Sequence, residues 1–296
     1  MQEKTFSSSS PDGAFNLHYK LWGDEMDHTL VCVHGLTGNS LDFRPLAENL
    51  APKGWRIAAI DMAGRGLSDY HDDPAHYCFA QYMNDLQNFL EVIGCNAPAS
   101  CSWLGVSMGG LLGIRMAGQE NSPIGHLILS DVGPEVPQFD LDFISKVIKL
   151  SPEYNDPLEA IPILKMAKGT AYSRGPMNDE EWLYLATTSL KKRESDGKYI
   201  RNFDPQIAVM FDKEPLGEEE LWQYWKNITQ PVSALRGELS TLFPIKTLEK
   251  MRAEKKGHGV IHHTIAESGH VPSLYRDDQI NLIEQLLRRG QEAQAE

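Results

Sequence analysis

The chain has 296 residues, of which 41% are hydrophobic and 23% are charged, a balance typical of a soluble globular protein. This length suits one large domain, or one domain that carries an insertion. The formal net charge of −13 argues against nucleic acid as a partner, because an acidic surface repels phosphate backbones. The sequence shows no apolar run suited to a signal peptide or a membrane span, so we expect a cytoplasmic protein.

Short apolar runs alternate with amphipathic segments through the first 130 residues. Apolar or alternating runs predict strands at 15–22, 29–33, 55–60, 100–104 and 126–129. Helical spacing predicts helices at 41–50, 79–93 and 108–118. This order of elements is typical of the α/β class, with a mostly parallel sheet covered by helices on both faces.

The pattern changes between residues 134 and 227, which are rich in aromatic, Met and charged residues. No strand is evident there, and helices are predicted at 141–150, 157–168, 179–191 and 218–226. Alternation resumes with strands at 232–235 and 259–265, helices at 244–254 and 277–289, and a tail from 291 that we expect to fray. We therefore expect a core formed by 1–133 and 228–296, and a helical insertion at 134–227.

Ser107 lies in the sequence Gly105-Val-Ser-Met-Gly109, between a predicted strand and a predicted helix. The pattern G-x-S-x-G in this setting is typical of a nucleophile elbow. Glycines permit so tight a turn, which lifts the serine Oγ above the sheet. The backbone N–H of Met108 begins the helix, points into the same space and can hold an oxyanion.

Further motifs resemble those of the α/β-hydrolase superfamily, in its serine-nucleophile branch with a helical cap. His34-Gly35-Leu36 follows the strand at 29–33, and residues 61–69, 129–134, 236–240 and 268–272 fall in the order of that family. The resemblance covers nearly the whole chain. It implies an α/β-hydrolase core, a cap at 134–227, and the backbone N–H of Leu36 as the second oxyanion donor beside Met108.

His270 is the predicted general base. It lies in a Gly-containing loop between the last predicted strand and helix, at the edge of the sheet where Ser107 lies. The sequence does not decide which residue is the acid that pairs with His270. The resembling family usually has Asp in the loop after its seventh strand, which corresponds to 232–235 here, but this chain has Thr241 there, which carries no charge. The two candidates are Asp131, which follows the strand at 126–129 (the sixth strand in the family's count), and Glu238, and we favour Asp131.

The chain has four cysteines, Cys32, Cys78, Cys95 and Cys101, and none forms a C-x-x-C pair, so neither a zinc site nor a redox pair is indicated. Because Cys32 and Cys101 lie in apolar runs typical of buried strands, we expect reduced thiols in a cytoplasmic protein. No metal-binding spacing is present either, so we expect neither a metal nor a cofactor.

These residues predict a serine hydrolase that cleaves an ester bond of a small, largely apolar substrate through a covalent acyl-enzyme. The same residues leave other scissile bonds open, namely those of amides, lactones and thioesters and the carbon–carbon bonds of β-diketones. They also leave two other functions open, an acyltransferase and a non-catalytic ligand receptor of the same fold. The sequence carries no indication of the oligomeric state.

Overall fold

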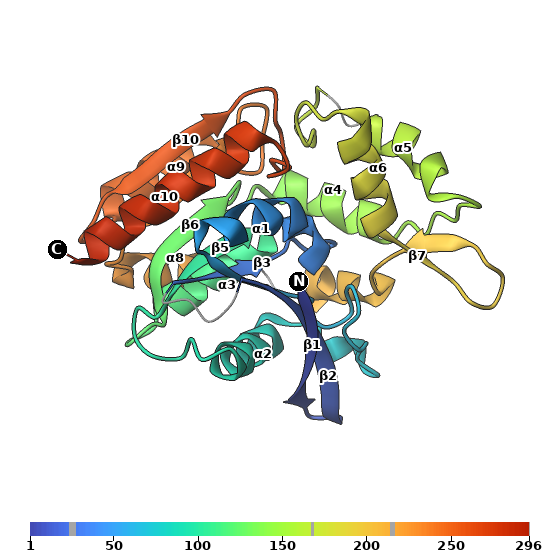
Figure 1. Ribbon diagram of the computed structural model, residues 1–296, viewed down its shortest axis with the longest axis horizontal. Coiled ribbons are helices and arrows are strands. Elements are labelled where there is room, and N and C mark those ends of the chain that lie inside the picture. The colour runs from blue at the N-terminus through green and yellow to red at the C-terminus, as the bar shows by residue number, and fades with distance from the viewer. Residues whose placement is uncertain (24–27, 167–168, 214–216, 296) are drawn as a thin grey trace.

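The structure is a computed structural model that describes residues 1–23, 28–166, 169–213 and 217–295. At its centre lies an eight-stranded sheet with the order β1-β2-β4-β3-β5-β6-β9-β10 (Figure 1). The bounds of the strands are β1 (Gln2–Ser10), β2 (Gly13–Trp22), β3 (Thr29–Val33), β4 (Arg56–Ile60), β5 (Cys101–Val106), β6 (Ile124–Ser130), β9 (Val232–Gly237) and β10 (Val260–Ile265). Strands β3 to β6, β9 and β10 pair in parallel, whereas β1 and β2 join antiparallel. The predicted α/β class is confirmed.

Strand β1 is absent from the sequence prediction. Phe6 is its one large apolar residue, and it ends in four serines, so the alternation that marks a half-buried strand is missing. The strand exists because all nine of its residues pair with β2. Tertiary pairing therefore decides a segment whose own pattern is uninformative.

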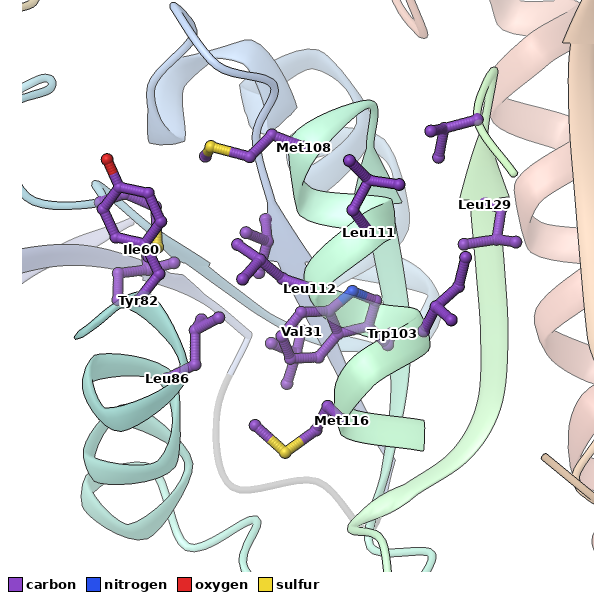
Figure 2. Packing of buried hydrophobic residues seen from close by; sticks show 14 of the residues in the cluster. Val31, Ile60, Tyr82, Leu86, Trp103, Met108, Leu111, Leu112, Met116 and Leu129 are labelled. Carbon is purple, nitrogen blue, oxygen red and sulfur yellow. The ribbon is translucent and has the colours of Figure 1, made fainter. Parts of the chain in front are cut away.

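Helices cover both faces of the sheet because neighbouring residues of each central strand point to opposite sides. Leu30 and Cys32 of β3 pack with helices α1 (Arg44–Leu50) and α10 (Asp277–Ala295). Val31 and Val33 face the other layer. Figure 2 shows Val31 there with side chains of α2 (Phe79–Val92) and α3 (Met108–Ala117). The helices α8 (Glu218–Asn227) and α9 (Ile245–Glu254) add buried side chains to the same cluster. No helix in the described ranges is long and apolar enough to cross a membrane.

The segment between β6 and β9 contains helices and a β-hairpin. Besides α8 it holds α4 (Gln138–Ile148), α5 (Ile161–Lys165), α6 (Asp179–Thr188), α7 (Met210–Lys213), β7 (Leu190–Lys192) and β8 (Tyr199–Arg201). Figure 1 shows α4, α5, α6 and β7 together on one side of the molecule. We predicted no strand in this segment, and this prediction was wrong, because Leu190–Lys192 pairs antiparallel with Tyr199–Arg201. Residues 167 and 168 of the predicted helix 157–168 lie outside the described residues.

The predicted fraying of the tail from residue 291 was also wrong, since α10 continues to Ala295. Its last residues include Ala, Glu and Gln, which all favour helix. The Gln294 side chain also lies against Gly125 at the start of β6, where a Cβ on that glycine would come within 2.4 Å of the Gln294 amide nitrogen.

The buried His126 of β6 should make the fold sensitive to acid. Its Nε2 pairs with Ser233 Oγ at 2.9 Å, and burial lowers the pKa of His126 from 6.5 to about 4. The unfolded chain therefore takes up this proton first, and the free energy of unfolding should fall as the pH drops from about 6.5 to about 4, by ~3 kcal/mol for this group. Urea unfolding of wild type and His126→Gln across this range should give a shallower pH dependence for the variant. Identical slopes would contradict this assignment.

Candidate active site

Ser107 occupies the turn between β5 and α3 with φ 50° and ψ −113°, a conformation that non-glycine residues rarely adopt. The flanking glycines make the turn possible. A Cβ on Gly105 would lie 2.3 Å from the carbonyl oxygen of Gly109, and one on Gly109 would lie 2.1 Å from that of Val33. The strained turn is held by backbone hydrogen bonds, including one from the Ser107 N–H to the Ser130 carbonyl. The serine hydroxyl is thereby presented at the carboxyl end of the sheet.

Asp131, His270 and Ser107 form a continuous hydrogen-bonded series. His270 Nε2 lies 2.9 Å from Ser107 Oγ, and His270 Nδ1 lies 2.8 Å from Asp131 Oδ2. An ionised carboxylate can only accept, so Nδ1 must carry the proton, which leaves Nε2 free to accept from the serine hydroxyl. The His270 side chain is 12% exposed and that of Asp131 is fully buried.

Asp131 is held by the last residue of β9 and by the loop that follows this strand. Its Oδ1 accepts the Gly237 N–H at 2.8 Å, and its Oδ2 accepts the Ser240 hydroxyl at 2.6 Å. The other acid candidate, Glu238, is exposed and accepts the backbone N–H of Glu267 at 2.9 Å. Of the two carboxylates weighed from the sequence, Asp131 is therefore the one that the fold brings to His270.

Leu36 lies in a loop whose orientation is set by buried polar groups. The Gly35 carbonyl accepts hydrogen bonds from His34 Nδ1 at 2.6 Å and from the Gly38 N–H at 3.1 Å. Because a trans peptide directs its N–H opposite to its carbonyl, the Leu36 N–H points away from these donors. Gly35 lies beside Ser107, since a Cβ on it would be 3.6 Å from the Ser107 Cβ.

The tautomer of His34 follows from its two contacts. Its Nε2 accepts the Met62 N–H at 3.0 Å, so its Nδ1 is the protonated nitrogen that donates to Gly35. Burial lowers the pKa of His34 to about 4, which keeps the ring neutral and this pattern intact near pH 7. The buried Arg65 adds a hydrogen bond from its Nε to the Leu36 carbonyl at 2.9 Å. Sequence reasoning identified His34 only as part of a motif and missed Arg65, because both act through tertiary contacts.

The segment between β6 and β9 supports the loop between β10 and α10 that carries His270, residues 266–276, which we call the histidine loop. The Gly269 N–H donates to the Ser173 carbonyl at 2.7 Å, and the His270 N–H donates to the Ala171 carbonyl at 2.6 Å. Between these two acceptors lies Tyr172, whose hydroxyl donates to the buried Asp140 Oδ1 at 2.8 Å.

Thr241, where the resemblance led us to expect the family's usual acid, also donates to Asp140 Oδ1, at 2.7 Å. This hydrogen bond ties the loop after β9 to α4. The buried carboxylate of Asp140, which sequence reasoning did not single out, thus joins both segments that surround the histidine loop. Nothing in the local sequence pattern marks it.

A cavity of about 1880 Å³ opens beside Ser107, at the carboxyl ends of the parallel strands. Ser107 and His270 line it together with Leu36 and Met108, the residues whose N–H groups were predicted to face an oxyanion. Apolar side chains of α4 and its neighbourhood make up much of the remaining wall, among them Val136, Leu141, Phe143, Ile144, Ile148 and Phe211. Residues that line the cavity therefore come from the sheet and its loops and from the segment between β6 and β9.

Comparison with known proteins identifies the family. The sequence profile of the alpha/beta hydrolase fold matches residues 28–277. The chain belongs to the alpha/beta hydrolase fold family. A 3-hydroxybutyrate-oligomer hydrolase from Cupriavidus necator is 32% identical over 93% of this chain and 94% of its own length. The chain is accordingly an enzyme, a hydrolase of this family.

Two solved structures are similar over nearly the whole chain. An alpha/beta hydrolase from Novosphingobium aromaticivorans has a TM-score of 0.84 and 31% identity, and covers 97% of this chain and 98% of its own. A Rickettsia typhi protein has a TM-score of 0.87 and 28% identity, and covers 98% of this chain and 99% of its own.

The described residues contain no group of three or more His, Cys, Asp or Glu side chains arranged to hold a metal ion. The four cysteines are free, and Cys32, Cys95 and Cys101 are buried.

Proposed function

We propose that this hydrolase is a serine esterase that cleaves its substrate through an acyl-enzyme on Ser107, with His270 as the general base and Asp131 as the acid that orients it. The observation that carries the proposal is the series of hydrogen bonds from Asp131 Oδ2 through the imidazole to Ser107 Oγ. Such a series leaves the serine hydroxyl bonded to a neutral nitrogen that can take its proton.

Acylation begins when Ser107 Oγ attacks the ester carbonyl carbon and its proton passes to His270 Nε2. The carbonyl oxygen becomes an anion, which accepts hydrogen bonds from the backbone N–H groups of Leu36 and Met108. The carboxylate of Asp131 stabilises the imidazolium that His270 becomes when it takes this proton. The bond to the alcohol oxygen then breaks, and this oxygen leaves with the proton from Nε2.

Deacylation repeats these steps with water. His270 Nε2 takes a proton from the water as its oxygen attacks the acyl carbonyl carbon. The second oxyanion collapses, the bond to Ser107 Oγ breaks, and Oγ takes back the proton. No cofactor is required for either half of the reaction.

We further propose that the substrate is a short ester of hydroxy acids, and that the insertion at 134–227 forms a cap that selects it. The relative from Cupriavidus necator, named as acting on 3-hydroxybutyrate oligomers, supports this substrate class by its identity over nearly the whole chain. The cavity supports it too, because about 1880 Å³ exceeds the ~300–1,000 Å³ typical of small-ligand sites and leaves room for linked units. The largely apolar wall suits the methyl-bearing chain of such units.

An assay of two substrates tests this function. The purified protein should hydrolyse both p-nitrophenyl butyrate and the linear dimer of 3-hydroxybutyrate, with the higher kcat/KM for the dimer. Release of nitrophenol is followed by absorbance and release of the monomer by chromatography. Pretreatment with a serine-directed sulfonyl fluoride should abolish both. Turnover of neither ester would contradict the proposed esterase function and favour hydrolysis of another bond, such as a carbon–carbon bond. Transfer of the acyl group to an added alcohol in place of water would favour an acyltransferase.

A further inference from the structure

We propose that Arg174 binds a carboxylate of the substrate, so that the enzyme prefers esters that carry a free acid group. The inference rests on the proposed ester hydrolysis and adds an anionic end to the substrate class.

Arg174 lies next to the histidine loop. The carbonyl of its neighbour Ser173 accepts the N–H of Gly269, and a Cβ on its other neighbour, Gly175, would lie 3.4 Å from the Ser268 Cβ. The Arg174 side chain is half-buried and lines the same cavity as Ser107 and His270. A positive charge is thus built into the wall of the cavity, close to the loop that carries the proposed base.

The guanidinium of Arg174 has free donors. Within the described part of the chain, it makes no ion pair and no side-chain hydrogen bond. Arg201, another arginine of this cavity, donates its Nη1 to the Val147 carbonyl at 2.7 Å. A guanidinium offers five N–H donors in a planar fork that matches a carboxylate, and two of them can bind both of its oxygens.

Asp42 is an acid near Arg174, and its carboxylate is turned toward its own segment. Its Oδ2 accepts the Asn39 N–H at 3.4 Å in the cap of a short helix. Burial raises the pKa of Asp42, and the charge of Arg174 lowers it in part. The charge of Arg174 therefore acts on Asp42 without the two side chains forming an ion pair, and the Arg174 donors remain available to a ligand.

The chemistry of a hydroxy-acid ester fits this arrangement. A linear oligomer ends in one free carboxylate, and the first ester carbonyl lies only a few bonds away from it. A cation in the wall beside the histidine loop can hold that carboxylate while Ser107 attacks the carbonyl. Partial burial strengthens such a contact, because the attraction between opposite charges is less screened there than in water.

The test compares the 3-hydroxybutyrate dimer with its terminal carboxamide, which is neutral and of nearly the same shape. Wild type should cleave the internal ester of the acid with the higher kcat/KM. Arg174→Ala should lower kcat/KM for the acid by about 10- to 100-fold, mainly through KM, as expected for a lost charge-assisted hydrogen bond. The carboxamide should change by less than about threefold, and Arg174→Lys should retain part of the preference for the acid.

Lys146→Ala is the matched control, because this exposed residue of α4 also lines the cavity and its loss removes the same charge. The acid preference should persist in that variant. An equal loss on acid and carboxamide in Arg174→Ala would overturn the proposal and give Arg174 a structural role. An equal loss of acid preference in Arg174→Ala and Lys146→Ala would also overturn the proposal, because it would show that the overall positive charge of the cavity, and not a specific contact with Arg174, attracts the acid.

A binding measurement separates this inference from the proposed function. Calorimetry with Ser107→Ala should detect the dimer anion, and the added Arg174→Ala change should weaken its binding by a similar factor. A wild-type enzyme that cleaves acid and carboxamide equally well would refute carboxylate binding and leave esterase function standing. A protein that cleaves no ester but binds the anion through Arg174 would refute only the function. Failure of the anion to bind would refute the inference.

Discussion

Ser107→Ala is expected to lower kcat for ester hydrolysis by about 10⁴- to 10⁶-fold, the range seen when the nucleophile of a serine hydrolase is removed. The substitution deletes the oxygen that forms the acyl-enzyme and leaves the imidazole of His270 without its partner at 2.9 Å. Steady-state turnover of p-nitrophenyl butyrate measures the loss, and a fluorophosphonate probe reports on the covalent step independently. The variant should not be labelled.

The fold should survive this change. Alanine keeps the Cβ of serine at the same strained turn, and the hydroxyl of Ser107 bonds to His270 and not to the scaffold. The thermal midpoint should therefore stay within a few degrees of wild type. An unchanged fold with labelling at the wild-type rate would remove Ser107 from the mechanism.

The α/β class could be predicted because the central strands are short continuous apolar runs. Parallel strands buried on both faces leave this signature, and amphipathic helices alternate with them. The same rule failed for β1 and for the β7–β8 hairpin, where pairing with a neighbour, not the local pattern, makes the strand. Short or serine-rich edge strands carry too little apolar surface to be recognised alone.

The residues of the candidate site also differ in how far the sequence could predict them. Ser107 and His270 lie in motifs with a fixed relation to strand ends, so their meeting at one edge of the sheet could be expected. Asp131 could only be favoured over Glu238, because the choice depends on which loop reaches His270 Nδ1. Arg174 had no signal at all, since its place beside the histidine loop comes from the fold of the insertion, which no motif describes.

Asp131→Asn is expected to lower kcat by about 10⁴-fold, because an amide in place of a triad carboxylate favours the wrong histidine tautomer. The Asn side chain has one acceptor oxygen, whereas Asp131 accepts from His270, Gly237 and Ser240. When the amide NH₂ faces Nδ1, that nitrogen must accept and Nε2 must carry the proton, so it cannot take one from Ser107.

Glu238→Gln is the matched control. It makes the same change of one carboxylate to an amide, three residues before Thr241, on an exposed side chain that bonds to the Glu267 N–H. Its kcat should change by less than about tenfold. A near-normal Asp131→Asn together with an inactive Glu238→Gln would transfer the role of the acid. Unfolding curves for both variants separate lost chemistry from lost stability.

A rescue experiment tests whether the usual position of the acid in the family still reaches His270. Thr241→Asp alone should not restore Asp131→Asn, since the new carboxylate would face the buried Asp140, to which the Thr241 hydroxyl donates at 2.7 Å. Like charges at that distance strongly oppose each other's ionisation. Adding Asp140→Asn removes this repulsion and offers an amide donor, so the triple variant should recover part of kcat. Rescue by Thr241→Asp without that third change would show that the loop moves away from Asp140 easily, and would contradict the tie between the β9 loop and α4.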